Sequence, residues 1–244
     1  MRDNETVEDQ LEKELYSKVC VVKSIKHFVG EASKEKVYMK EEDRFSLNLA
    51  TIIARDDEVV AVRLYASSDG YKVCLFKNSS WTPDDISYIR KVETYLKIIS
   101  KYSPATSEVV ENTENALIHE IKTYCYTKVK SRFEKLKRDI IGSQEGYIKS
   151  FTDFASINVN KLSKIDKEGL YKICKKCYMY YKITKRDPKA HPKFLGYLKK
   201  MGTYVGSVIE IIACANKPNH KTIFSKFELH KMEPTIIADQ PTFS

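Results

Sequence analysis

The sequence has no long apolar run and contains little glycine or proline. Eight Gly and seven Pro in 244 residues are too few for a collagen-like or linker-rich chain. No segment approaches the roughly 18 consecutive apolar residues that a transmembrane helix needs. The first twenty residues are acidic and lack an apolar segment, so we do not expect a secretory signal. We therefore expect an intracellular protein, cytoplasmic or nuclear, without a membrane partner.

Several motifs of catalysis and phosphate binding are also missing. The chain contains neither a glycine-rich phosphate-binding loop nor a Gly-x-Ser-x-Gly motif. Its six cysteines are scattered, and in a reducing compartment we expect them to be thiols. Cys174 and Cys177 form a Cys-x-x-Cys pair inside a helical pattern, where core packing explains them better than a zinc ribbon or a redox motif does.

The charge of the chain is distributed unevenly. The net charge is +9, but residues 121–231 hold 25 Lys and Arg against nine Asp and Glu. Residues 1–120 hold 17 basic residues against 22 acidic ones. Such asymmetry indicates a surface for nucleic acid or another polyanion. It is equally compatible with two halves of opposite charge that dock on each other.

The clearest local signal is a β-hairpin. Residues 57–66 are rich in β-branched and apolar residues, and residues 71–78 alternate in part. The polar sequence Ser-Ser-Asp-Gly between them is typical of a tight turn. Apolar residues at helical spacing predict helices over 5–29 and 45–55, on the N-terminal side of the hairpin.

The residues after the hairpin are predicted to form a block of helices. Thr82 and Pro83 are typical of a helix N-terminus, and further helices are predicted over 108–141 and 166–186. A short helix is predicted for HPKFLGYLKKM, residues 191–201. Strands are predicted for TYVGSVIEIIACA, residues 203–215, and within KTIFSKFELHKM, residues 221–232.

These elements together predict a mixed α/β fold. We expect a mixed sheet built from the hairpin, at about 57–78, and C-terminal strands, at about 203–230, with a large helical insert. In terms of domains, we expect an N-terminal helical segment at 1–50 and an α/β domain at 51–244, with the insert at about 82–187.

Two stretches resemble a known family. They are ATIIARDDEVVAVRLYASSDGYKVCLFKN, residues 50–78, and AHPKFLGYLKKMGTYVGS, residues 190–207, which is followed by Cys214. Over about sixty residues they resemble the cytidine-deaminase-like superfamily, in its fungal and rickettsial nucleic-acid deaminase branch with a long helical insert. The resemblance implies a hairpin, a helix that opens with His-x-Glu, a strand, and a Cys-x-x-Cys pair. In such deaminases one His and two Cys hold zinc, and the Glu moves the proton.

The sequence departs from this pattern at two of the residues that zinc-dependent deamination requires. His191 takes the histidine position, but Lys193 stands in place of the glutamate, and Lys217 stands where the second cysteine should follow Cys214. The resemblance therefore implies a non-catalytic member without a cofactor. An alternative is a zinc-dependent deaminase with the unorthodox ligands His191, Cys214 and His220. A plainer interpretation makes His191 the residue that precedes a helix starting at Pro192.

Two basic helical segments are candidates for binding nucleic acid, because Tyr can stack on bases while Lys and Arg contact phosphates. The candidates in residues 171–186 are Lys175, Lys176, Tyr178, Lys182, Lys185 and Arg186. Those in residues 131–138 are Arg132, Lys135, Lys137 and Arg138. The alternative for both segments is a helix with a buried apolar face and a solvated Lys face.

The sequence favours a non-catalytic, deaminase-like protein that binds nucleic acid, or the acidic surface of another protein, through its basic C-terminal half. The rival hypothesis is an intracellular interaction or scaffold protein without a nucleic-acid role. Binding of generic single-stranded nucleic acid at low salt distinguishes the two hypotheses.

Overall fold

A three-stranded sheet and a larger set of helices make up the part of the chain that the structure, a computed structural model, describes. The described residues are 39–55, 58–67, 70–143, 145–187, 190–221, 224 and 228–232. Their elements, in chain order, are α2 (Glu41–Ile53), β1 (Val60–Ser67), β2 (Gly70–Lys77), α3 (Pro83–Lys101), α4 (Ser107–Tyr124), α5 (Tyr126–Gly142), α6 (Gly146–Ala155), the 3-10 helix η1 (Val159–Lys164), α7 (Lys167–Thr184), α8 (Pro192–Ala215), the 3-10 helix η2 (Pro218–His220) and β3 (Glu228–Met232). The helix predicted over residues 5–29 lies outside the described residues.

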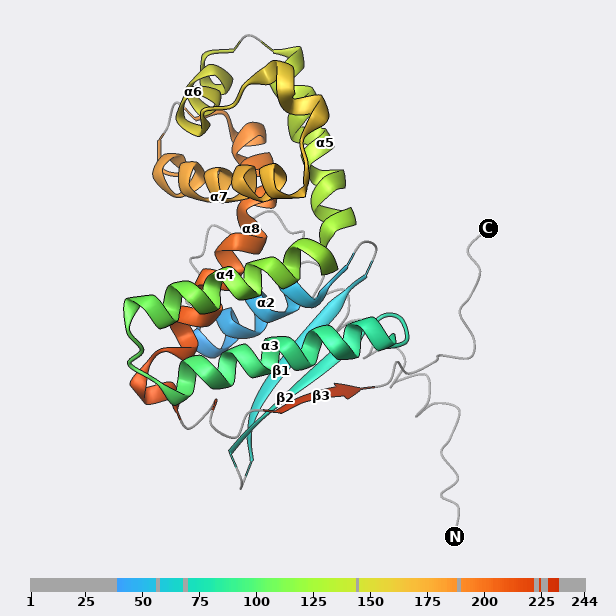
Figure 1. The fold of residues 1–244 in the computed structure, drawn as a ribbon, viewed down its shortest axis with the longest axis vertical. Helices are drawn as coiled ribbons and strands as arrows, with labels where there is room; N and C mark the ends of the chain where they lie inside the picture. The colour runs from blue at the N-terminus through green and yellow to red at the C-terminus, as the bar shows by residue number, and fades with distance from the viewer. Residues whose placement is uncertain are drawn as a thin grey trace, which may run out of the picture. The chain divides into compact units, whose positions relative to one another are not determined.

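The sheet confirms the predicted hairpin. β1 and β2 are antiparallel, with Val62 opposite Leu75. β3 lies on the other side of β2 and runs parallel to it, with Leu229 opposite Val73. Because β3 follows the whole helical block, strands far apart in the sequence lie side by side (Figure 1). The predicted fold class, a mixed α/β fold with a mixed sheet and a large helical insert, is confirmed.

The strand predicted over residues 203–215 is wrong, because this segment is part of the long helix α8. The helix predicted at 191–201 does not stop there but continues as far as Ala215. The segment from Val205 onward is almost entirely apolar, and such a run is compatible with either a buried strand or a buried helix. Among the described residues, β3 is the strand that the C-terminal part adds to the sheet.

The surroundings of α8 explain its apolar sequence. This helix packs against α2, α3, α4, α5 and α7, and Figure 1 shows it, in orange, running from α7 down behind α4. From Met201 to Ala215 most of its residues are buried, with Glu210 and Ala213 exposed, so this part of α8 lacks the regular polar face that would reveal a helical period. Of the helices that the structure describes, none combines the length and the apolar character needed to cross a membrane.

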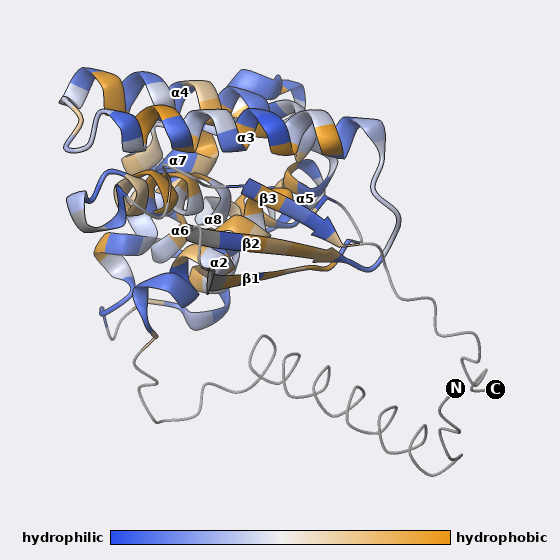
Figure 2. Ribbon diagram, turned by 90° about the horizontal axis from the view of Figure 1, so that it is seen from below, coloured by the Kyte–Doolittle hydropathy of each residue, from blue (hydrophilic) through white to orange (hydrophobic). Residues whose placement is uncertain are grey.

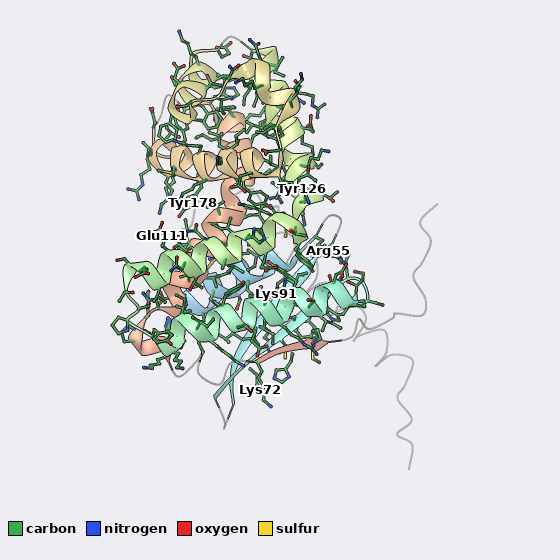
Figure 3. All side chains as sticks on the ribbon, viewed as in Figure 1. Arg55, Lys72, Lys91, Glu111, Tyr126 and Tyr178 are labelled. Carbon is green, nitrogen blue, oxygen red and sulfur yellow. The ribbon has the colours of Figure 1, made fainter. Side chains whose placement is uncertain are left out.

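Two glycines allow α7 and α8 to approach closely at Tyr178. A Cβ at Gly202 would lie 2.6 Å from the Cα of Tyr178, and one at Gly206 would lie 2.7 Å from the Cε2 of its ring. The two glycines are four residues apart and so lie on one face of α8. Tyr178, labelled in Figure 3, is therefore a packing residue of the contact between α7 and α8.

Within the insert, α3 and α7 follow the predicted patterns, α4 and α5 do so with one interruption, and α6 and η1 were not predicted. A single helix was expected over 108–141, but Cys125, with φ −100° and ψ 11°, separates α4 from α5. At the start of α3, Thr82 caps the helix as predicted, in a capping box with Asp85. Figure 2 shows α3 and α4 with hydrophobic and hydrophilic residues alternating along their length, as in helices that cover a core on one side. The predicted apolar stripe runs across the break and is buried: Leu117, Ile121, Cys125, Val129, Phe133, Leu136 and Ile140.

Candidate nucleic-acid interface

A groove lined mainly by basic side chains runs between α5 and α8. Its volume is about 680 Å³, and we call it the α5/α8 groove. Four of its lining side chains are cationic and one, Asp139, is a carboxylate. The cationic ones are Arg132, Lys135 and Arg138 from α5 and Lys200 from α8, and Tyr197 of α8 completes the lining. The groove thus combines positive charge with an aromatic ring.

The helical spacing of these residues explains why they meet. Arg132, Lys135 and Arg138 recur every three residues, beside the buried stripe of α5. On α8, Tyr197 and Lys200 are three residues apart. Side chains at this spacing lie on one face of a helix, so each helix presents one polar face to the groove. α5 and α8 pack against each other, which brings the two faces together.

Arg132 fixes the floor of the α5/α8 groove. Its Nη1 donates a hydrogen bond to the main-chain oxygen of Lys200 at 2.9 Å, which links α5 to α8. Its guanidinium carbon lies 5.1 Å from the ring centroid of Tyr204, within the range of a cation–π contact. Lys135, Arg138 and Lys200 are exposed instead, so their charges are available to a ligand.

A smaller hollow continues the groove toward the start of α8. Its volume is about 200 Å³, and it shares Arg138 and Asp139 with the α5/α8 groove. Lys193 also lines it, together with a pair of aromatic rings. These rings, from Tyr147 and His191, are stacked with centroids 4.7 Å apart and planes inclined by 8°. Cations and aromatic faces are therefore adjacent in both parts of the groove.

His191 is the N-cap residue of α8, as the plainer interpretation of the sequence predicts. Its Nδ1 accepts a hydrogen bond from the main-chain N–H of Phe194 at 3.4 Å, and Pro192 is the first helical residue. Because Cys214 lies near the other end of this 24-residue helix, a rise of 1.5 Å per residue separates the two by about 35 Å. His191 and Cys214 therefore cannot bind the same zinc ion.

Cys214 and His220 do lie close together. The sulfur of Cys214 is 3.3 Å from Nδ1 of His220, and the other ring nitrogen, Nε2, is 3.5 Å from a carboxylate oxygen of Glu41. Burial raises the pKa of the Cys214 thiol to about 12. In the described part of the chain, no group of three or more His, Cys, Asp or Glu side chains is placed to hold one metal ion.

The candidates on α7 lie on a different surface from those on α5. Lys175 and Lys176 line a second groove, formed by α6, η1 and α7. Lys182 lies over the ring of Tyr178 at 5.2 Å, while Lys185 and Arg186 are exposed at the end of α7. One edge of the Tyr178 ring lies against Gly206 of α8, and base stacking by Tyr178 stays a prediction.

The cysteine pair of α7 also belongs to the core. Cys174 and Cys177 are fully buried, and burial raises the pKa of the Cys174 thiol to about 12. Tyr171 is buried beside them and donates a hydrogen bond to the main-chain oxygen of Ile121 at 3.0 Å. The interpretation of this segment as a helix with a buried apolar face and a solvated Lys face thus describes α7 correctly.

On α5, one of the four predicted residues lies outside the groove. Lys137 does not line it and forms an ion pair with Glu134 at 3.1 Å. Sequence reasoning missed the groove residues of α8, although Lys193, Tyr197 and Lys200 follow the i, i+4, i+7 spacing of one helix face. That signal was present, but nothing in the sequence showed that this face adjoins α5.

A buried charge cluster joins four elements elsewhere in the fold, and we call it the Asp85 cluster. Its members are Arg55 (Figure 3), Glu58, Lys77, Asp85 and Tyr124. The side chains of Lys77 and Asp85 are both 0% exposed, and Lys77 Nζ lies 2.6 Å from Asp85 Oδ2 and 2.8 Å from Glu58 Oε1. Arg55 lies 2.9 Å from Asp85 Oδ1, and the Tyr124 hydroxyl donates to the same atom at 2.7 Å. The cluster thus connects the ends of α2, β2 and α4 to the first turn of α3.

The cluster should make stability depend on pH. Burial is the largest single influence and opposes the ionisation of Asp85 and Glu58, but the hydrogen bonds from Lys77 and the other donors together lower the pKa of both carboxyls. A carboxyl whose folded pKa lies below its unfolded value stabilises the fold above the unfolded pKa, about 3.9 for Asp, and loses this effect as the pH falls through the folded value. Between about pH 5 and about pH 3, the wild type should therefore lose more free energy of unfolding, measured by urea denaturation, than Asp85→Asn. An equal loss in both proteins would contradict this expectation.

Comparison with known proteins gives no relative for this chain. No protein-family model matches it, and neither a curated protein nor a solved structure does.

Proposed function

We propose that this protein binds single-stranded nucleic acid in the α5/α8 groove. One observation carries the proposal: Lys135, Arg138 and Lys200 converge from two helices on a groove that Tyr197 also lines. Exposed cations neutralise phosphates, and aromatic side chains stack on unpaired bases. The excess of positive charge over residues 121–231 supports the same ligand, because it attracts polyanions over a longer range.

The aromatic residues favour a single strand over a duplex. Bases in a duplex are stacked on each other, so their faces are not available to a protein side chain. The stacked rings of Tyr147 and His191 lie in the hollow that continues the groove. An unpaired base beside this pair would extend an existing stack, while its phosphate would reach Arg138 or Lys193.

The proposal does not depend on the resemblance to the deaminases. The strand implied by that resemblance at 203–207 lies within α8. Lys193, which stands at the position of the deaminase glutamate, is exposed and lines the hollow next to Arg138. Its positive charge suits a phosphate contact there. We propose a binding function for the groove and assign no catalytic residue.

Reversing two groove charges should weaken nucleic-acid binding strongly. For the double variant Lys135→Glu/Lys200→Glu, we expect the affinity for a fluorescein-labelled oligo(dT) to fall about 10–100-fold at 50 mM salt, because two phosphate contacts become repulsive. The slope of log affinity against log salt concentration should decrease by about 1.4, since each contact with a single strand contributes about 0.7. Fluorescence anisotropy between 50 and 200 mM salt measures both quantities.

Lys137→Glu is the matched control for this experiment. It reverses one charge, where the double variant reverses two, and lies on the same helix as Lys135, but Lys137 is outside the groove and pairs with Glu134. We expect its affinity to stay within about twofold of the wild type, apart from the loss of long-range attraction. Two results would overturn the proposal: no oligo(dT) binding by the wild type at low salt, or an equal loss in Lys137→Glu and the double variant.

A further inference from the structure

We infer that the second groove, between α6, η1 and α7, binds an acidic amphipathic helix of a partner protein. Its volume is about 820 Å³, and we call it the α6/α7 groove. Figure 1 shows α6 and α7 close together at the end of the fold to which α5 also extends. The inference is independent of the nucleic-acid proposal, because the two grooves share no lining residue.

The floor of the α6/α7 groove is aliphatic. It is formed by Ile157, Leu162, Ile165, Ile173 and Met179. Leu162 and Ile173 are buried, whereas Met179 is 44% exposed and is the floor side chain with the most surface left for a partner. Burying aliphatic surface of this kind is favourable at about 25 cal/mol per Å². Methionine is also common at helix-binding surfaces, because its flexible side chain adapts to the bound residues.

The rim of the groove is basic. Lys161, Lys164, Lys172, Lys175 and Lys176 all line it. Of the described lining residues, one carries a carboxylate: Asp166, whose Oδ1 accepts a hydrogen bond from the main-chain N–H of Gly169 at 2.8 Å. Asp166 is thereby engaged as the N-cap of α7. Five lysines around an apolar floor select a partner with an apolar centre and acidic flanks.

The chemistry of the floor favours a peptide over nucleic acid. Among the residues that the structure describes, no aromatic side chain lines the α6/α7 groove, so bases would find no ring there on which to stack. The α5/α8 groove differs in this respect, because Tyr197 lines it. An aliphatic floor instead matches Leu, Ile or Val side chains that project from one face of a helix.

The spacing of the groove residues along α7 indicates how long a partner helix the groove can hold. Lys172, Lys176 and Met179 follow the i, i+4, i+7 pattern, so they form one stripe on α7. Seven residues of helix correspond to a length of about 10 Å, or about two turns. A partner helix with apolar anchors at i, i+3 or i+4, and i+7 would cover this stripe and bring its acidic residues to the lysines.

The test uses the full chain and two labelled peptides of about 18 residues, both made of Leu, Ala and Glu. In one peptide the Leu residues follow the i, i+3, i+4, i+7 pattern. In the other the same residues are scrambled, so that the charge is equal but no apolar face exists. Fluorescence anisotropy should show binding of the amphipathic peptide at least about tenfold tighter than binding of the scrambled one.

Two groove variants and one control assign the binding to this site. Met179→Gln should weaken binding of the amphipathic peptide about 5–10-fold, and Lys161→Glu/Lys172→Glu should weaken it at least about tenfold. Ile98→Gln is the control, because Ile98 is similarly exposed, at 39%, but lies on α3. It should leave the affinity unchanged, and all three variants should keep the wild-type affinity for oligo(dT) to within about threefold.

Several outcomes would overturn the inference. Equal binding of both peptides would show that the interaction is only non-specific attraction between charges. Failure of the amphipathic peptide to bind at 100 µM would show that the α6/α7 groove is not a binding site for such a helix. Loss of oligo(dT) binding with no loss of peptide binding in Lys161→Glu/Lys172→Glu would make this groove a nucleic-acid surface instead. Because the variants of the α5/α8 groove are different residues, either proposal can fail while the other survives.

Discussion

Replacing Asp85 with alanine should lower the free energy of unfolding by about 3–5 kcal/mol, the usual effect of removing one partner from a buried ion pair. The carboxylate is fully buried and accepts bonds from Lys77, the Thr82 main chain and Tyr124, while Arg55 pairs with it. Without it, the Lys77 ammonium keeps the carboxylate of Glu58 and the ring of Trp81 as neighbours among the described residues, and the hydroxyl of Tyr124 loses its acceptor. Urea denaturation followed by circular dichroism measures the effect.

Asp84 provides the matched control. It precedes Asp85 in the first turn of α3 but is exposed. Asp84→Ala should therefore lose only a dipole interaction of about 0.3–1 kcal/mol. Lys77→Met should fall between the two, because Asp85 then retains Arg55 and Tyr124. If Asp85→Ala destabilised the protein no more than Asp84→Ala, the Asp85 cluster would not hold these elements together.

Adding one methyl group to α8 should have opposite effects at two of its glycines. At Gly202, the new Cβ would lie 2.6 Å from both the Cα and the N of Tyr178. Both atoms are main-chain atoms of α7, so the two helices must move apart. Overpacking of this kind destabilises proteins by about 1–3 kcal/mol, which exceeds the gain of about 1 kcal/mol that alanine brings to a helix. Gly202→Ala should therefore unfold at a lower urea concentration than the wild type.

Gly196→Ala is the companion variant in the same helix. A Cβ at Gly196 has nothing within 4 Å, so only the helix propensity changes. The free energy of unfolding should rise by about 0.5–1 kcal/mol. Stabilisation by both alanines would show that α7 and α8 can separate at Tyr178 without loss, which would contradict the close packing described here.

Local patterns were sufficient to predict much of the fold. The hairpin, the start of α3 at Thr82 and the buried stripe through Cys125 follow from alternation, capping chemistry and helical spacing, all of which act within a few residues. The segment from 203 to 215 was different, because its apolar run fits a strand and a helix equally well. What decides its structure is that α8 packs against α2, α3, α4, α5 and α7, which is a property of the tertiary fold.

The candidate site could be predicted only on one of its two sides. Arg132, Lys135 and Arg138 were identified because charges concentrate on α5 at helical spacing. The partner residues Tyr197 and Lys200 were not, because the pairing of α5 with α8 brings together segments far apart in the sequence. Tyr178 was named as a candidate because it lies among basic residues, but nothing in the sequence showed that Gly202 and Gly206 of α8 approach it closely.

The central position of α8 also has a consequence for how the protein is made. The contact between Asn48 of α2 and Ser207 of α8 joins residues 159 positions apart. At about 5–20 residues per second, a ribosome needs about 8–30 s to synthesise that stretch. Until then, the residues of α2 that are buried in the finished fold, Phe45, Leu49 and Ile52, lack the helix that covers them. The packing of α2 is therefore completed only after α8 has emerged from the ribosome.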